Sequence, residues 1–192
     1  MLAFEPSTRE RSYLLTHLRL NQCRNVNVES LALGRKAGKG ELFVVEGMET
    51  GCNCLRPPRV SEPTYKVSVD VETLDNYLEH RGIERVDFVK IDVEGAELEV
   101  FKGATHLLKQ RPRPIILAEI EDIRTEAWNH SAKEAVDYLR QHDFDWFRFE
   151  GDSLEPVEAD RREFNENLVA FPRECDLPEL AVHLRISAGT QC

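Results

Sequence analysis

The sequence has no long apolar run, and its longest apolar stretches are the short ones around Pro114–Ile120 and Asn167–Phe171. A membrane-spanning helix needs about 20 consecutive apolar residues, so we predict no membrane partner. The first residues, Met1–Pro6, have neither a basic lead nor a long apolar stretch, so no secretory signal peptide is expected. These absences favour a cytoplasmic protein.

Clustered positive charge is also lacking. The 25 Lys and Arg residues are outnumbered by 35 Asp and Glu residues, and the formal net charge is −10. Binding along a nucleic-acid backbone needs clustered Lys and Arg, so we predict no nucleic-acid partner. The two basic clusters, Arg56–Arg59 and Arg111–Arg113, contain prolines, which favours solvated loops over a nucleic-acid surface.

A metal-binding cysteine pattern is missing as well. The sequence has five cysteines, an odd number, and without a secretory signal they are predicted to be reduced thiols. Cys52 and Cys54 are separated by one residue, and no second pair of Cys or His lies nearby. Because zinc normally takes four converging ligands, we predict no metal site.

Short apolar strands alternate with amphipathic helices, which predicts an α/β domain with a doubly wound, mostly parallel sheet. The predicted strands are Leu2–Glu5, Val26–Leu33, Glu41–Val45, Tyr65–Val69, Val86–Val93, Pro114–Ile120, Asp145–Phe149 and Asn167–Phe171. The predicted helices begin at Ser7 or Thr8, at Thr73, after Gly95, where the helix extends to Leu108, and at Ser131.

The predicted strands differ in their expected positions in the sheet. The strand Val86–Val93 is apolar on both faces, which favours a central, doubly covered position parallel to Pro114–Ile120. The last two strands form a C-terminal pair that we expect to be antiparallel. Residues 46–63 lack periodicity and are predicted to form a surface loop. Residues 1–172 make up the predicted domain, and residues 173–192 a peripheral C-terminal tail.

Polar residues at the carboxyl ends of these strands are the candidates for ligand binding, because open parallel sheets bind ligands there. They are Glu5, Ser30, Asp92, Glu94, Glu97 and Glu119. A carboxylate at the end of the first strand can accept two hydrogen bonds from a ribose diol, or it can be a solvated strand end. An unpaired acid on a central strand is costly to bury, which favours a function for Asp92. In contrast, Glu97 can simply complement a helix dipole.

The most specific segment of the sequence is Lys90-Ile91-Asp92-Val93-Glu94-Gly95-Ala96-Glu97. Other matching segments are Ala3-Phe4-Glu5-Pro6, Leu31-Ala32-Leu33-Gly34, Leu74-Asp75, Lys102-Gly103-Ala104 and Asn167-Leu168-Val169. In order and spacing, over roughly residues 1–172, these segments resemble the FkbM-type methyltransferases.

The resemblance implies a Rossmann-like domain that uses S-adenosylmethionine (SAM) to methylate a hydroxyl group on a sugar or a secondary metabolite. By position, Glu5 matches the acid that holds the ribose of the cofactor, and Ser30 and Leu31 match the segment that lines the adenine. The resemblance places Asp92 close to the methionine moiety or the acceptor.

The predicted catalytic residues are Asp92, Glu94 and Glu97, all of which belong to the matching octet. The cofactor carries the hard chemistry, and the protein supplies alignment. A carboxylate such as Asp92 or Glu94 can accept the hydroxyl proton. The small-molecule or glycan acceptor is the expected partner.

The sequence departs from the family at its beginning. Family members carry a first strand and a glycine-rich turn before the segment that matches Ala3–Pro6, and nothing here corresponds to them. By the family's strand order, the absent strand lies between Leu2–Glu5 and Val86–Val93. Its absence exposes two sheet edges, which predicts possible self-association.

Three explanations stay open. The protein starts further upstream, which we favour; the gene is truncated and its product inactive; or another chain supplies the strand. The alternative function is therefore a non-catalytic remnant or an interaction module of the same fold. A dinucleotide oxidoreductase is a weaker alternative, because no G-x-G-x-x-G motif is present.

Overall fold

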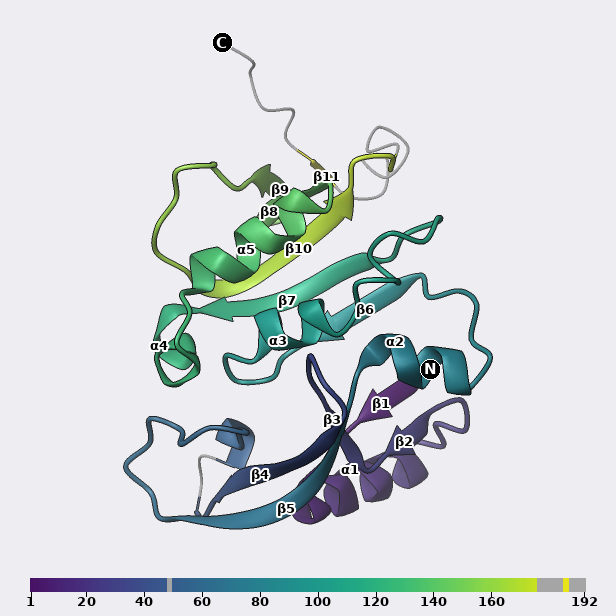
Figure 1. Ribbon diagram of the computed structural model, residues 1–192, viewed down its shortest axis with the longest axis vertical. Helices are drawn as coiled ribbons and strands as arrows, with labels where there is room; N and C mark the ends of the chain where they lie inside the picture. The colour runs from purple at the N-terminus through teal and green to yellow at the C-terminus, as the bar shows by residue number, and fades with distance from the viewer. Residues whose placement is uncertain (48–49, 176–184, 187–192) are drawn as a thin grey trace.

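The computed structural model describes residues 1–47, 50–175 and 185–186, which form a mixed α/β fold with three sheets (Figure 1). A two-stranded sheet has the order β1-β2, a three-stranded sheet the order β3-β5-β4, and a six-stranded sheet the order β11-β9-β8-β10-β7-β6. No helix in these residues is both long enough and apolar enough to span a membrane.

The two-stranded sheet pairs β1 (Leu2–Phe4) in parallel with β2 (Asn27–Glu29), and α1 (Thr8–Leu20) connects the two strands. The single strand predicted at Val26–Leu33 is wrong. Its second half is a separate strand, β3 (Leu31–Leu33), which pairs with β5 in another sheet. The chain therefore changes sheets at Ser30, because its two halves find hydrogen-bonding partners in different strands.

The three-stranded sheet contains β3, β4 (Gly38–Val45) and β5 (Thr64–Glu72). β5 pairs in parallel with β3 and antiparallel with β4. The long connection between β4 and β5 is mostly loop, as predicted, with a short 3-10 helix, η1 (Thr50–Cys52). A small apolar cluster stabilises this sheet through Ala32, Leu42, Val44 and Val69.

The six-stranded sheet confirms that Val86–Val93 and Pro114–Ile120 contain adjacent parallel strands, which are β6 (Phe88–Ile91) and β7 (Ile115–Glu121). The predicted C-terminal pair is also confirmed: β8 (Phe144–Glu150) and β10 (Asn165–Pro172) are antiparallel. The sequence analysis missed β9 (Ser153–Pro156), which extends the sheet beside β8.

The prediction of a mostly parallel sheet is confirmed only in part, because the sheets are mixed. β10 lies antiparallel between β7 and β8, and β8 is antiparallel to β9. The tight turn between β8 and β9 accounts for the antiparallel pairing of these two strands, because a short connection joins antiparallel neighbours. Most of the predicted C-terminal tail lies outside the described residues, but β11 (Arg185–Ile186) pairs in parallel with β9.

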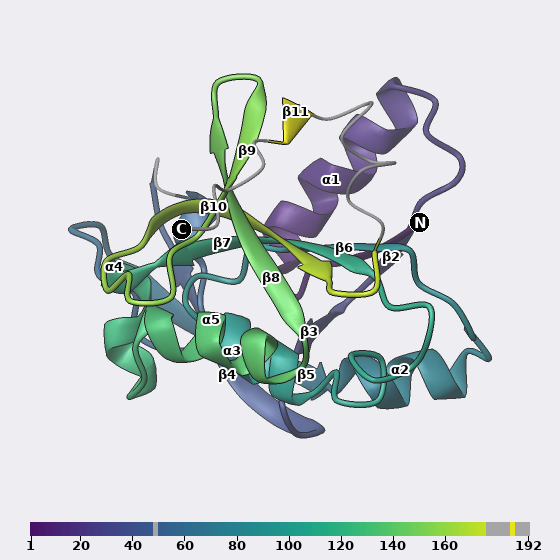
Figure 2. The same cartoon turned by 90° about the horizontal axis from the view of Figure 1, so that it is seen from above.

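The main core lies between the six-stranded sheet and its helices. Figure 2 shows α2 (Leu74–His80), α3 (Glu97–Lys102) and α5 (Ala132–Gln141) on one side of this sheet and α1 on the other. A short segment, α4 (Asp122–Thr125) followed by η2 (Glu126–Trp128), connects β7 to α5. Ser131 begins α5 with a capping box, in which its side chain accepts from the Glu134 amide.

The helix predicted after Gly95 is shorter than expected, because it ends at Lys102 rather than reaching Leu108. Gly103 follows it, and a Cβ atom at that position would lie 2.1 Å from the carbonyl oxygen of Gly34. Close contact between these two backbones therefore requires glycine. The turns that replace the rest of the helix still bury Leu108.

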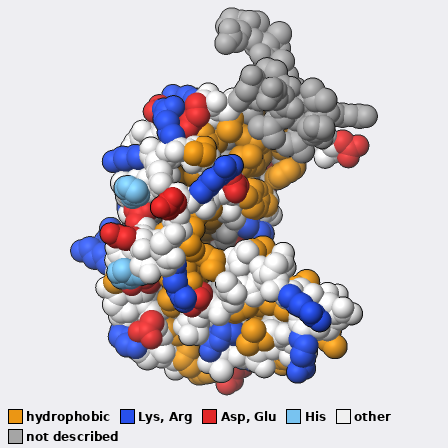
Figure 3. All heavy atoms as spheres, turned by 90° about the vertical axis from the view of Figure 1, so that its right-hand side faces the viewer, with side chains coloured by type: hydrophobic (Ala, Val, Ile, Leu, Met, Phe, Trp, Pro, Cys, Tyr) orange, Lys and Arg blue, Asp and Glu red, His pale blue; other side chains and the backbone are white. Residues whose placement is uncertain are grey.

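The strands β1 and β6 each have one unpaired edge within the described part of the chain. β1 pairs only with β2, and β6 only with β7. The prediction that β6 is a central, doubly covered strand is wrong within the described residues. β6 is an edge strand of its sheet, and one of its side chains, Phe88, is 54% exposed. Figure 3 shows a hollow between the two halves of the molecule, with hydrophobic side chains on its walls. The absence of a strand between β1 and β6 stays a prediction.

Candidate functional site

Three carboxylates come together at the end of β6 and β7. The parallel register pairs Ile91 with Ala118, so the residues that follow, Asp92 and Glu119, lie side by side. One carboxylate oxygen each from Asp92, Glu94 and Glu119 lie within 4.8 Å of one another. The sequence placed Asp92 and Glu94 among the catalytic candidates, while Glu119 was considered only for its place at the end of the neighbouring strand.

Basic side chains neutralise only part of this charge. The Lys90 Nζ donates to Asp92 Oδ2 at 2.6 Å, and Arg124 Nε lies 3.0 Å from Glu94 Oε2. Burial raises the pKa of Glu94, although Arg124 opposes this. Burial, and then the charge and hydrogen bond of Asp92, raise the pKa of Glu119. The cluster can therefore hold or accept a proton closer to neutral pH than ordinary carboxyl groups do.

Carboxylate oxygens are also the ligands that Mg²⁺ and Ca²⁺ prefer. The prediction that the protein has no metal site was argued from the cysteines and did not consider these carboxylates. It stays a prediction. Within the described residues, Cys23, Cys52, Cys54 and Cys175 form no disulfide. The reduced state of the cysteines stays a prediction.

A tight turn sets the direction of the Glu94 side chain. Glu94 and Gly95 have positive φ values of 54° and 91°. The carbonyl oxygen of Glu94 accepts hydrogen bonds from Cys54 Sγ at 3.1 Å and from Trp128 Nε1 at 3.3 Å. These two side chains hold a backbone conformation that a non-glycine residue rarely adopts. Sequence reasoning missed both, because they lie in segments without periodicity.

We expect Gly95→Ala to lower the free energy of unfolding by about 2 kcal/mol, from backbone strain and overpacking. An added Cβ atom would lie 2.2 Å from the carbonyl oxygen of Arg124. Urea unfolding followed by circular dichroism measures the change. The control is Gly82→Ala, which also has positive φ but has open space around it, and which should cost only about 1 kcal/mol. Equal losses for the two variants would contradict the close contact.

Glu97 is buried and stabilises the turn at Glu94 and Gly95 through hydrogen bonds. It is 2% exposed, and its Oε1 accepts from the backbone amides of Val93 at 3.3 Å and Gly95 at 3.2 Å. Burial raises the pKa of Glu97 to about 7, although these backbone hydrogen bonds oppose the increase. The contacts give Glu97 a structural role in the turn, and its predicted catalytic role stays a prediction.

The raised pKa of Glu97 predicts a pH-dependent stability. Below about pH 4.5 the carboxyl group is protonated in both states. As the pH rises toward 7, the unfolded chain releases the proton first, so the free energy of unfolding falls by on the order of 3 kcal/mol. Denaturant unfolding between pH 4.5 and 8 should show this fall in the natural chain relative to Glu97→Gln. The control is Glu84→Gln at an exposed position, whose free energy of unfolding should change with pH as that of the natural chain does. The same pH dependence in Glu97→Gln would refute the assignment.

The residues predicted to bind the cofactor lie at the ends of β1 and β2. The register pairs Phe4 with Glu29, so Glu5 and Ser30 follow side by side, and Leu31 begins β3. Glu5 Oε1 accepts from the Ser7 amide at 2.8 Å, which orients the carboxylate. Burial raises the pKa of Glu5, and this hydrogen bond opposes the increase. The convergence of Glu5 and Asp92 on one crevice stays a prediction.

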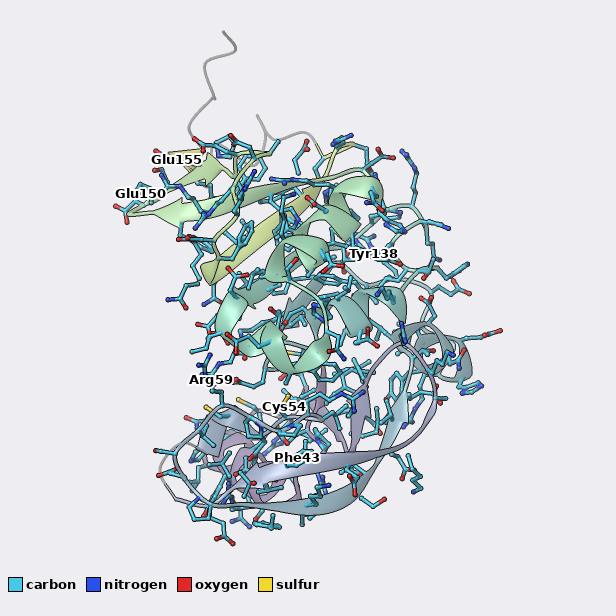
Figure 4. The ribbon with its side chains drawn as sticks, turned by 60° about the vertical axis from the view of Figure 1, so that its left-hand side comes forward. Phe43, Cys54, Arg59, Tyr138, Glu150 and Glu155 are labelled. Carbon is cyan, nitrogen blue, oxygen red and sulfur yellow. The ribbon has the colours of Figure 1, made fainter. Side chains whose placement is uncertain are left out.

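A cavity of about 470 Å³ adjoins the carboxylate cluster. Cys54, Pro57 and Pro58 of the β4–β5 connection line one side, and Ile123 and Ala127 line the other, beside Glu94. Figure 4 shows Cys54 and Arg59 at the junction between this connection and the six-stranded half of the molecule. Glu94 belongs to both the cluster and the cavity, so a molecule in the cavity has access to the carboxylates.

Comparisons with known proteins identify relatives of this chain. A family model described as the methyltransferase FkbM domain matches residues 1–145. "Methyltransferase 1" of Beauveria bassiana is 29% identical over 119 residues, which cover 54% of this chain and 48% of that protein. "Methyltransferase sdnD" of Sordaria araneosa is 29% identical over 131 residues, which cover 54% of this chain and 50% of that protein.

Two further matches differ in extent. The "AMB antimetabolite synthetase AmbE" of Pseudomonas aeruginosa is 38% identical over 72 residues, which cover 38% of this chain and 3% of that protein. The crystal structure of a methyltransferase FkbM from Methylobacillus flagellatus has a TM-score of 0.52 at 17% identity, and the match covers 88% of this chain and 36% of that one. This likeness shows the fold, and the chain spans half or less of each of these relatives.

Proposed function

Because this chain belongs to the FkbM methyltransferase family, we propose that it transfers a methyl group from SAM to a hydroxyl group of a sugar or a secondary metabolite. The observation that carries the proposal is the carboxylate cluster of Asp92, Glu94 and Glu119 at the end of two parallel strands, next to a cavity. Open α/β sheets bind ligands at this edge.

The residues present fit part of a SAM site. Glu5 and Ser30 lie side by side at the ends of parallel strands, and the Glu5 carboxylate can accept hydrogen bonds from a ribose diol. Leu31 follows with a half-buried apolar side chain that suits an adenine ring. When bound, SAM supplies a methyl group already activated by its sulfonium.

The protein then has two tasks, alignment and proton transfer. The turn at Glu94 and Gly95 fixes the carboxylates relative to the cavity, and alignment of reacting atoms lowers a barrier by removing their freedom to move apart. The acceptor hydroxyl must lose its proton as its oxygen bonds the methyl carbon. Asp92 or Glu94 accepts that proton, because Glu94 lines the cavity and Asp92 lies in the same carboxylate cluster.

A second candidate function rests on the unpaired edges of β1 and β6. Unpaired strand edges are templates for pairing with another chain. A non-catalytic interaction module would use this hollow to take up a strand from a second copy or a partner. Self-association of the chain through these edges is part of the same proposal.

The test is a transfer assay with SAM labelled in its methyl group and a panel of alcohols and sugars. Formation of S-adenosylhomocysteine together with a labelled ether supports O-methylation. Labelled product on nitrogen or carbon would overturn the hydroxyl assignment. Absence of transfer by a form of the protein that binds SAM would favour the interaction module.

A further inference from the structure

The β4–β5 connection carries two arginines that contact η2. The Arg56 guanidinium lies over the Trp128 ring, 5.2 Å from its centroid, and Arg59 Nη1 donates to both carboxylate oxygens of Glu126, at 2.9 and 2.7 Å. Trp128 and Glu126 both belong to η2, and Figure 4 shows Arg59 at this junction. The connection is therefore attached to η2 at two points.

The residues between the two arginines make these contacts interdependent. They are Pro57 and Pro58, whose rings fix φ and remove much of the freedom of the backbone. A short, stiff spacer keeps Arg56 and Arg59 at a nearly constant separation, so the two contacts with η2 form and break together. Taken singly, each is weak, because an exposed cation–π contact and an exposed ion pair contribute little stability.

Trp128 connects this attachment to the turn at Glu94. Its indole nitrogen donates to the Glu94 carbonyl oxygen at 3.3 Å, and its ring lies against Gly95, where an added Cβ atom would be 3.0 Å from Trp128 Cδ1. The β4–β5 connection also supplies Cys54, whose Sγ donates to the same carbonyl oxygen at 3.1 Å. Glu94 has a φ of 54°, which a non-glycine residue keeps only where its surroundings impose it. Loss of a donor would therefore allow the turn to relax.

We propose that Arg56 is a positioning residue for Glu94. By holding the indole ring of Trp128, Arg56 keeps the hydrogen bond to the Glu94 carbonyl oxygen in place, so the β4–β5 connection controls where the Glu94 carboxylate lies. A change of backbone conformation at Glu94 would move this carboxylate relative to the cavity that it lines. The effect on the reaction rests on the proposed methyl transfer, whereas the coupling between Arg56 and the turn requires only the contacts described above.

Amide hydrogen exchange, followed by NMR on the 192-residue chain without SAM, tests the coupling. The reporter is the Gly95 amide, which donates to Glu97 Oε1 at 3.2 Å, and the amides of α5 are the reference for global unfolding. Arg56→Ala should accelerate exchange at Gly95 about threefold, which is the size of an exposed cation–π contact. Arg56→Lys should exchange as the natural chain does, because it keeps the cation.

A double-mutant cycle tests whether Arg56 acts through Trp128. Trp128→Phe keeps an aromatic ring and removes the indole N–H group, so it should accelerate exchange at Gly95 about tenfold. Adding Arg56→Ala to Trp128→Phe should then have no further effect. The matched control is Arg161→Ala, because Arg161 makes a similar contact, 5.1 Å from the centroid of the Phe164 ring. This control should leave exchange at Gly95 unchanged relative to α5.

Kinetics in the form of the protein that binds SAM test the effect on the reaction. Arg56→Ala should lower the kcat of methyl transfer about threefold and leave the KM for SAM unchanged, and Arg56→Lys should restore the rate. Absence of transfer by the natural sequence would refute the proposed function, and hydrogen exchange would still decide the coupling. Unchanged exchange at Gly95 in Arg56→Ala, an equal acceleration in Arg161→Ala, additive effects in the cycle, or an unchanged kcat would overturn the proposal.

Discussion

SAM is expected to bind the 192-residue chain about 100-fold more weakly than a version in which a β-strand and a glycine-rich turn precede Met1. This difference in affinity corresponds to roughly 2.8 kcal/mol of binding free energy. The reason is the gap between β1 and β6, whose facing edges are unpaired in the described residues. Glu5 and Ser30 on one side and Asp92 on the other supply only part of a pocket. Contacts from part of a pocket rarely offset the cost of association, which is on the order of 4–15 kcal/mol.

Calorimetric titration of both forms measures this difference. Glu5→Gln in the extended form is the companion variant, because it removes a negative charge from the proposed ribose site and should weaken SAM binding there. Sedimentation of the 192-residue chain tests whether the unpaired edges lead to self-association. Tight binding of SAM by the 192-residue chain would contradict the expectation, and binding by neither form would favour the interaction module.

Asp92→Asn is expected to lower methyl transfer about 100-fold, the lower end of the usual contribution of a general base, in the form of the protein that binds SAM. Asp92 is the carboxylate that pairs with Lys90 and hydrogen-bonds Glu119. The substitution removes its charge and its ability to accept a proton while keeping its size. The rate is measured from labelled methyl groups transferred at saturating SAM.

The pH dependence distinguishes a chemical from a structural effect of Asp92→Asn. Burial raises the pKa of Glu94, Arg124 opposes this, and the Asp92 charge raises it further, so removing the Asp92 charge lets Glu94, the other candidate base, lose its proton at lower pH. Any remaining activity should therefore rise at lower pH than in the natural chain. The control is Asp87→Asn, which removes an exposed carboxylate paired with Arg85 and should leave the rate unchanged. An equal rate in Asp92→Asn and Asp87→Asn would exclude Asp92 as the base.

Local signals in the sequence predicted the helices whose starts are set by residues within the same segment. Ser131 and Glu134 specify the start of α5 through a capping box, and Thr73 caps α2 by accepting from the Asn76 amide. The side-by-side placement of Asp92 and Glu119 follows from two strands joined by a helix, because such strands run parallel and end at the same edge.

The elements that the sequence did not predict depend on distant partners. The break at Ser30 arises because β2 pairs with β1 while β3 pairs with β5. The end of α3 depends on the approach of Gly103 to Gly34. Neither contact leaves a periodic pattern in the sequence, since it joins segments that are far apart along the chain.

The sequence by itself determined the family, the α/β class and the carboxylates Asp92 and Glu94, because these depend on short motifs and on local periodicity. Only the tertiary structure decided how these carboxylates can act. Cys54 and Trp128 hold the Glu94 carbonyl oxygen from segments 40 and 34 residues away, and the same segments enclose the cavity beside Glu94. Such contacts form only after the β4–β5 connection and the α4–η2 segment pack against the β6 turn, so no local rule of sequence can specify them.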